Sequence, residues 1–158
     1  SGMDVVTHKN LNIDLSTAKK ATVVAFVSAK CPCSASHEAK LKSLAGEYTK
    51  NGFNFVGVHS NADEDEAMTS THFKASSFPF PVIQDKDTKI ANEYSALKTP
   101  HVFVVKNNGE ILYQGGVDDS HRAHEAKTNY LEQALAAINA GKAPEVKISK
   151  SLGCAIKR

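Results

Sequence analysis

The sequence places two cysteines with a single residue between them, where a short apolar run ends and a helix is expected to begin. They belong to the stretch Cys31-Pro32-Cys33-Ser34. Pro32 suits the first turn of a helix, and the unpaired N–H groups and dipole of a helix N-terminus favour a thiolate over a thiol. The ammonium group of Lys30 acts in the same direction, because a nearby cation lowers a thiol pKa from its reference of about 8.5. The arrangement predicts a nucleophilic thiolate at Cys31.

The partner of that thiolate is left open by the sequence. A Cys31–Cys33 disulfide closes a small ring, and residues two apart in a regular helix point away from each other. The pair is still feasible where Cys31 lies just outside the helix. The third cysteine, Cys154, is the alternative if the C-terminal segment crosses the site. We favour Cys31 and Cys33 as the reactive pair, with Cys154 as a third participant.

The elements that must position these residues are indicated by hydrophobic runs and turn signals. Thr22 to Val27 is a continuous apolar run typical of a strand that is buried on both faces. Further strands are predicted at 53–59, 79–83, 101–106 and 110–114, and helices at 32–51, 61–74, 87–96 and 122–140. The order is β-α-β-α-β-α-β-β-α, with the last two strands joined by Asn107-Asn108-Gly109. Helices between strands require parallel pairing, so the sequence predicts a three-layer α/β/α sandwich around one mixed sheet.

Composition narrows the class of protein further. The chain has 158 residues, of which 41% are hydrophobic and 23% charged, as expected of one globular domain. No stretch reaches the roughly 20 apolar residues of a membrane span, and the basic residues are scattered, so neither a membrane segment nor a nucleic-acid partner is expected. We expect a monomeric domain over 4–142, a tail over 143–158 that carries Cys154, and a cloning remnant at Ser1-Gly2-Met3. The compartment, exported to the periplasm or cytoplasmic, is left open.

Several segments together resemble a known family. Phe26 to Ser34 resembles the active-site segment of thioredoxin-like proteins, and Thr99-Pro100 resembles their cis-proline loop. Most of the chain, from about Thr22 to Cys154, resembles the redoxin group, which is related to the alkyl hydroperoxide reductase and thiol-specific antioxidant proteins and to bacterial thiol-disulfide oxidoreductases. The other matching segments are His59-Ser60-Asn61-Ala62, Phe80-Pro81-Val82 with Asp85, Tyr113-Gln114-Gly115-Gly116 with Asp118-Asp119, and Gly153-Cys154-Ala155-Ile156.

The resemblance implies a thioredoxin-like fold with an extra β-α insertion and a role in cell redox homeostasis. It implies that Cys31 is the attacking thiol and that Pro100 is the cis-proline, with the backbone of Thr99 beside the thiolate. A substrate chain could pair edge-on with that backbone. Cys33 and Cys154 complete the catalytic set. The implied partners are protein or small-molecule thiols and disulfides, and no cofactor is implied.

The chain departs from the family patterns at positions that bear on its chemistry. Ser34 stands where thioredoxin has its second cysteine, and the acid usually buried on the first strand falls at Ala25. The peroxiredoxin signature requires Pro and Thr where this chain has Val24 and Ser28. The leading hypothesis is therefore a thiol-disulfide oxidoreductase, and peroxide reduction with antioxidant activity at Cys31 is an alternative.

A further alternative is a metal-carrying protein. Soft Cys-X-Cys thiolates suit Cu(I) or Zn(II). The ligands would be Cys31 and Cys33 with His101 or Cys154. A redox-inactive interaction domain is the fourth hypothesis.

The remaining polar residues receive structural interpretations. We expect a solvated His37, a surface Glu38, a His101 that faces a helix or carries protons near the thiol, and a solvated first helical turn over Asp63 to Glu66. Asp118 and Asp119 are expected to cap a loop, and His121 and His124 to be exposed.

Overall fold

The computed structural model describes residues 1–158 and contains one seven-stranded sheet with the strand order β2-β1-β5-β4-β3-β7-β8. The strands are β1 Gly2–Asp4, β2 Asn10–Leu11, β3 Ala21–Phe26, β4 Phe53–His59, β5 Val82–Gln84, β7 His101–Val105 and β8 Ile111–Gly115. The β3–β4 and β4–β5 pairs are parallel and the other pairs are antiparallel. A separate two-stranded sheet joins β6 Lys98–Thr99 to β9 Cys154–Ala155.

The central strand β3 explains why the sheet is covered on both faces. All six of its residues are buried. Because side chains alternate along a strand, Val23 and Ala25 enter one apolar cluster, whereas Val24 and Phe26 enter the other. A strand that supplies both clusters cannot lie at the surface of the molecule.

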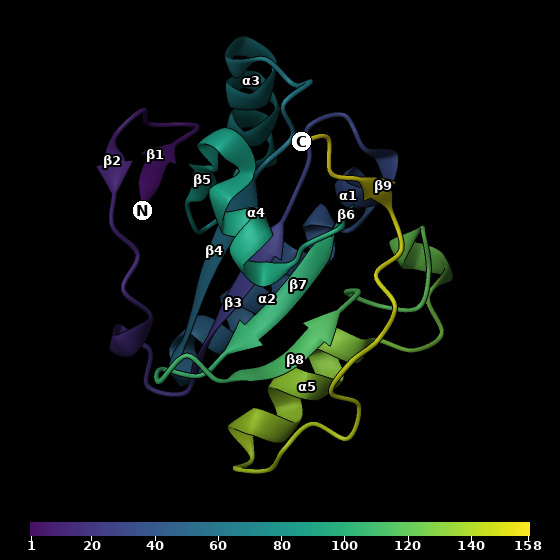
Figure 1. Cartoon of the computed structure of the whole chain (residues 1–158). Coiled ribbons are helices and arrows are strands. Elements are labelled where there is room, and N and C mark those ends of the chain that lie inside the picture. Colours follow the sequence, from purple (N-terminus) through teal and green to yellow (C-terminus); the bar gives the residue numbers. More distant parts are fainter.

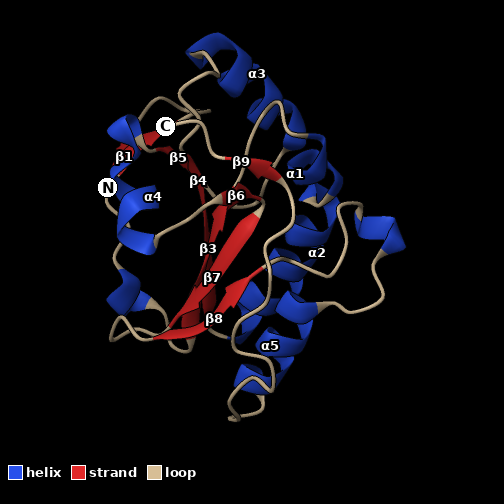
Figure 2. Ribbon diagram, turned by 45° about the vertical axis from the view of Figure 1, so that its right-hand side comes forward, coloured by secondary structure: helices blue, strands red, loops and turns tan.

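Helices of unequal number cover the two faces (Figure 1). One face carries α1 Pro32–Ser36, α2 Glu38–Tyr48, α3 Glu66–Ser76 and α5 Tyr130–Asn139. The other carries α4 Lys89–Tyr94, assisted by apolar residues of the N-terminal segment and by Ile156 of the tail. Figure 2 shows α2 and α5 on one side of the strands and α4 on the other. The predicted three-layer α/β/α sandwich with a mixed sheet is confirmed.

The predicted start of the last helix was wrong. The last helix begins at Tyr130 rather than near Arg122, because the preceding loop folds back on Asp119, whose carboxylate accepts a hydrogen bond from Lys127 N at 2.8 Å. At the other end of the chain, Gly2 and Met3 belong to β1 and pair with Leu11 and Gln84. The N-terminal hairpin thus extends the sheet beyond β5.

The tail over 143–158 follows the sheet edge before it reaches the cysteines. Lys147 O and Ser149 N pair with Gln114 of β8 at 2.9 and 3.0 Å, and the chain then climbs to β9 beside α1 (Figure 1). It contains four basic side chains and one acidic side chain.

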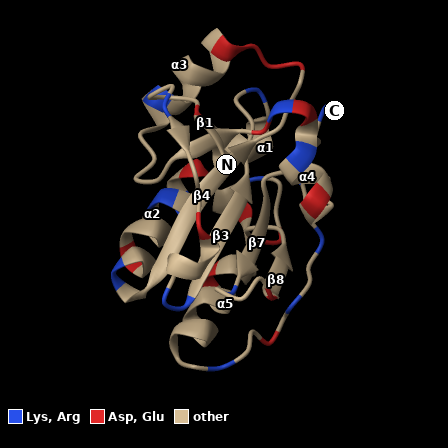
Figure 3. Cartoon of the chain, turned by 60° about the vertical axis from the view of Figure 1, so that its left-hand side comes forward, with Lys and Arg blue, Asp and Glu red and all other residues tan.

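Figure 3 shows acidic and basic residues interspersed along the ribbon. No helix combines the length and the apolar content that a bilayer crossing requires.

Candidate active site

Cys31 lies at the junction between β3 and the first helix. It is the N-cap residue of α1, with extended backbone angles (φ −70°, ψ 117°), and Pro32 follows at the first helical position. No side chain caps the helix at this end. The local structure is the one that the sequence predicts, since the apolar strand ends and a proline starts the helix without losing a donor.

The sulfur of Cys31 is bonded to Cys154, 123 residues further along the chain. The two Cα atoms are 5.9 Å apart, which lies within the usual range of about 4.4–6.8 Å for a disulfide. The structure therefore differs from the favoured Cys31–Cys33 pair. The reason is geometric: Cys31 is outside the helix with its sulfur beside Cys154, whereas Cys33 is inside the helix with its sulfur directed to backbone carbonyl groups of His121 and Leu152.

The peptide bond between Thr99 and Pro100 is cis, and it lies directly beside the disulfide. The carbonyl oxygen of Thr99 is 3.3 Å from Sγ of Cys31. Thr99 is also the register partner of Cys154 in the β6–β9 pair. The structure thus brings together four of the five predicted site residues: Cys31, Cys154, Thr99 and Pro100.

Cys33, the fifth, is a free and buried thiol. Its Sγ lies 3.0 Å from the carbonyl oxygen of His121 and 3.2 Å from that of Leu152, so the single S–H proton has an acceptor in the loop before α5 and another in the tail. Burial, together with the negative charge of Asp118, raises the pKa of the Cys33 thiol. Cys33 is therefore poorly ionised at neutral pH and contacts the tail two residues before Cys154.

A buried hydrogen-bond network holds the loop that presents Cys31. The hydroxyl oxygen of Ser28 accepts the backbone N–H groups of Lys30 and Cys31 at 3.2 and 3.1 Å, and the hydroxyl itself donates to Glu64. Glu64 also accepts Ala29 N at 2.6 Å and His59 Nε2 at 2.9 Å. The Glu64 carboxylate is thus the centre of the support under the Cys31 loop.

The electrostatics of this network depend on its donors. Burial would by itself raise the pKa of Glu64, but the hydrogen bonds from His59, Ser28 and Ala29 outweigh it and lower that pKa to about 2. Glu64 is therefore a buried carboxylate at neutral pH. The prediction of a solvated helical turn over Asp63 to Glu66 was wrong for this residue, because α3 starts only at Glu66 and Glu64 turns inward.

The ammonium group of Lys30, which was expected to favour the Cys31 thiolate, lies close to Asp63 instead. Nζ of Lys30 lies 3.9 Å from the carboxylate of Asp63 and 3.2 Å from its carbonyl oxygen, and the side chain is half exposed. Ser34, which replaces thioredoxin's second cysteine, is fully buried and its hydroxyl accepts Ser28 N at 2.9 Å. Ser34 ties the loop to the helix instead of supplying a thiol.

A second buried pair lies under the other end of α1. His37 is buried, and its Nε2 lies 2.9 Å from the carboxylate of Asp118 while its Nδ1 lies 2.6 Å from Cys33 O. Desolvation lowers the pKa of His37, but the hydrogen bonds to Asp118 and Cys33 outweigh it and the net direction is upward. The prediction of a solvated His37 was wrong, because Asp118 from the loop after β8 seals it.

His101 lies next to Pro100, but its environment does not suit a proton carrier. Its Nδ1 accepts Leu97 N at 3.2 Å, its ring lies 4.5 Å from that of Phe103, and burial lowers its pKa to about 4. No group of three or more His, Cys, Asp or Glu side chains is arranged to hold a metal ion. The metal alternative with Cys31, Cys33 and His101 is thus not assembled, since Cys31 is bonded to Cys154.

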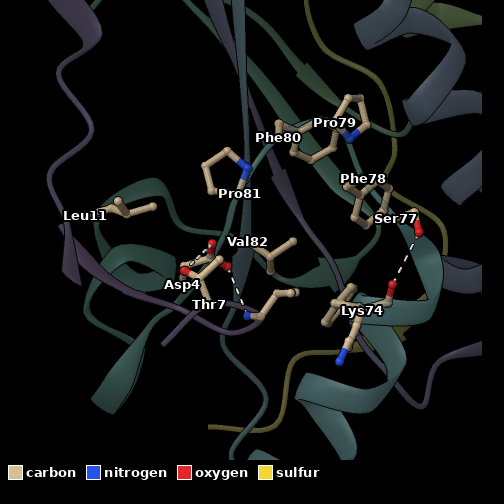
Figure 4. Close-up of a pocket in the computed structure, with 12 residues that line it drawn as sticks. Asp4, Thr7, Leu11, Lys74, Ser77, Phe78, Pro79, Phe80, Pro81 and Val82 are labelled. Atoms are coloured by element: carbon tan, nitrogen blue, oxygen red, sulfur yellow. Dashed lines mark hydrogen bonds between the residues drawn. The ribbon is translucent and has the colours of Figure 1, made fainter. Parts of the chain in front are cut away.

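One surface cavity lies apart from the cysteines. It measures about 500 Å³ and lies between the N-terminal hairpin and the segment before β5 (Figure 4). Its lining includes Phe73, Phe78 and Phe80, with Asp4 and Lys74 as charged members. The carboxylate of Asp4 is already used by Val6 N and the Thr7 hydroxyl at 3.1 and 3.0 Å.

Sequence reasoning missed two members of the site, His59 and Glu64. Glu64 is one of four consecutive acids, and no local pattern separates the buried one from its solvated neighbours. One signal was available. Ala25 leaves β3 without the acid that thioredoxin-like proteins bury there, so another acid could be sought near the thiol.

Comparisons with known proteins agree with this geometry. The Redoxin family model matches residues 5–133. The thiol-disulfide oxidoreductase ResA of Halalkalibacterium halodurans is 24% identical over 102 residues, which are 63% of this chain and 57% of that protein. A conserved protein from Geobacillus kaustophilus superposes with a TM-score of 0.88 (24% identity, 99% of this chain and 86% of the other). A thiol:disulfide interchange protein DsbE from Chlorobium tepidum has a TM-score of 0.65 (19% identity, 78% and 82%). The chain belongs to the redoxin family.

Proposed function

We propose that this protein is a thiol-disulfide oxidoreductase in which Cys31 is the attacking thiol and Cys154 the resolving thiol. The observation that supports the proposal most is the Cys31–Cys154 disulfide beside the cis Thr99–Pro100 bond. A disulfide is the product that a dithiol leaves behind after it has reduced a substrate. The relatives named as thiol-disulfide oxidoreductases support the same chemistry.

The environment of Cys31 favours its thiolate once the disulfide is reduced. The end of α1 has no capping side chain, so the N–H groups of its first turn are left to stabilise a negative sulfur. Lys30 contributes less than the sequence suggests, because its ammonium is shared with Asp63. The thiolate of Cys31 attacks a substrate disulfide and forms a mixed disulfide, which Cys154 then resolves.

The positions of the two arginines favour disulfides over peroxide as substrates. Peroxide reduction needs a cation that polarises the O–O bond beside the thiolate. Arg122 pairs with Glu125 at 3.5 Å, and Arg158 donates to Asn92 and Ala96 at 3.0 and 2.7 Å. Both guanidinium groups are thus engaged away from Cys31.

The test is turnover of insulin disulfides with dithiothreitol as the reductant. We expect Cys31→Ser to lose activity by about a hundredfold or more, because the nucleophile is gone. Cys33→Ser is the matched control two residues further along and should retain activity within about twofold. Unchanged turnover in Cys31→Ser would overturn the proposal. Faster oxidation of the dithiol by hydrogen peroxide than by insulin would assign the chain to peroxide reduction instead.

A further inference from the structure

The end of the tail is held against the active site as an extended strand with a partner on each side. Ile156 N donates to Leu97 O at 3.0 Å, in register with the β6–β9 pairing. On its other side Lys157 O accepts Ala62 N at 2.7 Å, from the loop after β4. The segment Gly153 to Arg158, here called the tail strand, therefore lies between β6 and that loop, and the space that it fills is here called the groove.

The groove imposes a residue type at three positions of the tail strand. A Cβ at Gly153 would lie 2.0 Å from Thr99 O, so only glycine permits this approach of the two backbones. Ile156 is 6% exposed and belongs to the apolar cluster that contains Ala96 and Phe103. Arg158 ends the strand with hydrogen bonds to Asn92 and Ala96. The groove thus accepts glycine before the cysteine and an aliphatic side chain two residues after it.

The tail strand depends on the disulfide to stay in place. β6 and β9 contribute two residues each, and so short a two-stranded pair is marginal by itself in water. Reduction of the Cys31–Cys154 bond removes the covalent tie and leaves this short pairing, the Ile156 contact and the hydrogen bonds of Lys157 and Arg158. The groove beside Cys31 can then exchange its occupant.

We propose that the groove is a specificity site for an external protein segment that resembles the tail strand. The preferred partner is an extended polypeptide with a disulfide-bonded cysteine, glycine immediately before it and an aliphatic residue two positions after it. This inference rests on the proposed function and deepens it. Substrate and tail strand occupy the same edge in turn, so that the return of the tail displaces the product.

The exchange balances without an added oxidant or reductant. The thiolate of Cys31 attacks the docked substrate sulfur, an S–S bond forms, and the substrate's other sulfur leaves as a thiolate. The thiolate of Cys154 then attacks Sγ of Cys31 and expels the docked cysteine as a second thiolate. The protons of the Cys31 and Cys154 thiols go to the two substrate thiolates. The substrate disulfide gains two electrons, and the chain ends with the Cys31–Cys154 disulfide.

The experiment uses the full chain with Cys33→Ala and Cys154→Ser, which leaves Cys31 as the single thiol. Its substrate is a peptide with the sequence of residues 151–158, activated as a mixed disulfide with 5-thio-2-nitrobenzoate. Two further peptides carry Gly153→Val or Ile156→Ser. Release of the chromophore gives the rate, mass spectrometry identifies the Cys31–peptide adduct, and circular dichroism confirms that the protein variant is folded.

We expect the native peptide to react at least about tenfold faster than either altered peptide at concentrations below saturation. Ile156→Ser in the protein's own tail should accelerate all three peptides, because the competing strand is weakened. Equal rates for the three peptides, with normal reactivity toward the small disulfide 5,5′-dithiobis(2-nitrobenzoate), would overturn the specificity site and leave the proposed function intact. If the protein did not react with the small disulfide either, both the proposed function and this inference would be overturned.

A second copy of the chain is the competing occupant, since every molecule carries the same tail strand. Wild-type protein reoxidised at high concentration shows which occupant is preferred. We expect monomers with an internal Cys31–Cys154 bond, because a tethered strand has a high effective concentration. Covalent dimers joined through Cys31 and Cys154 of different copies would assign the groove to self-association and overturn the proposal.

Discussion

Thr99 and Cys154 face each other as register partners across β6 and β9, and Thr99 O lies 3.3 Å from Sγ of Cys31. The backbone before Pro100 is therefore paired with the chain's own tail while the Cys31–Cys154 disulfide is closed. Closure of the disulfide and coverage of this edge are one structural event. An external chain can reach the edge only after reduction.

The different roles of the three cysteines lead to a first prediction. In the oxidised protein Cys33 is the one free thiol, so unfolding and alkylation should label Cys33 alone. We expect Cys154→Ser to slow insulin turnover by about tenfold, because the mixed disulfide on Cys31 loses its internal resolving thiol. Mass spectrometry of the labelled peptides and turnover assays check both statements. Labelling of Cys154 in oxidised wild-type protein would contradict the assignment.

Much of the fold follows from local patterns in the sequence. The run from Thr22 to Val27 is apolar at every position except Thr22. Such a run is typical of a strand that is buried on both faces, and it overlaps β3, Ala21–Phe26, at all but one residue. The Asn107-Asn108-Gly109 turn marks the β7–β8 hairpin, with Gly109 at φ 93°. The polar loop over 122–129 was misjudged, because it is held by Asp119 rather than by helical bonds. Contacts of that kind leave no periodic signal.

The candidate site was predictable only in part, for a related reason. The position of Cys31 at a strand–helix junction depends on adjacent residues and was predicted. Its bond to Cys154 depends on the path of the tail, and the burial of His37 depends on Asp118, 81 residues away. Such long-range pairs are fixed by packing of the whole domain. A single sequence shows the residue types but not which of them meet.

The Glu64 network predicts an acid-sensitive contribution to stability. The folded-state pKa of Glu64 is lowered from 4.5 to about 2. A lowered pKa stabilises the folded state above pH 4.5, and that stabilisation is lost as the pH falls from 4.5 toward about 2. Glu64→Gln should therefore reduce the free energy of unfolding by about 2–3 kcal/mol at neutral pH and by much less near the lower limit. Urea denaturation over this pH range measures both.

Glu66→Gln is the matched control for that experiment. Glu66 belongs to the same acidic run, but its side chain is 76% exposed and has only a 3.6 Å contact with His8. Its replacement should change the free energy of unfolding by less than about 0.5 kcal/mol at any pH. If Glu64→Gln lowered the free energy of unfolding no more than Glu66→Gln does, the buried carboxylate would not support the Cys31 loop.

The His37–Asp118 pair predicts the opposite pH dependence. The pKa of His37 is raised above its ordinary value of 6.5, so its stabilisation is fully present below pH 6.5 and is lost as the pH rises through the folded-state pKa. His37→Gln should destabilise the protein by about 3 kcal/mol at low pH, and by less in alkaline solution. NMR titration of the His37 ring and urea denaturation measure the pKa and the stability. His124→Gln is the control, since its side chain is 75% exposed. A His37 pKa below that of His124 would refute the charged buried pair.

The close approach at Gly153 predicts how the tail strand and the disulfide are coupled. In Gly153→Ala the new Cβ would lie 2.0 Å from Thr99 O, so β9 must move away from β6. We expect the Cys31–Cys154 bond to become easier to reduce, by about tenfold or about 1.4 kcal/mol in its equilibrium with glutathione. Gly46→Ala is the matched control, because nothing lies within 4 Å of its added Cβ in α2. That change should raise the free energy of unfolding by about 0.5–1 kcal/mol and leave the glutathione equilibrium unchanged. Equal equilibrium constants with glutathione in the two variants would mean that pairing of β6 with β9 does not stabilise the disulfide.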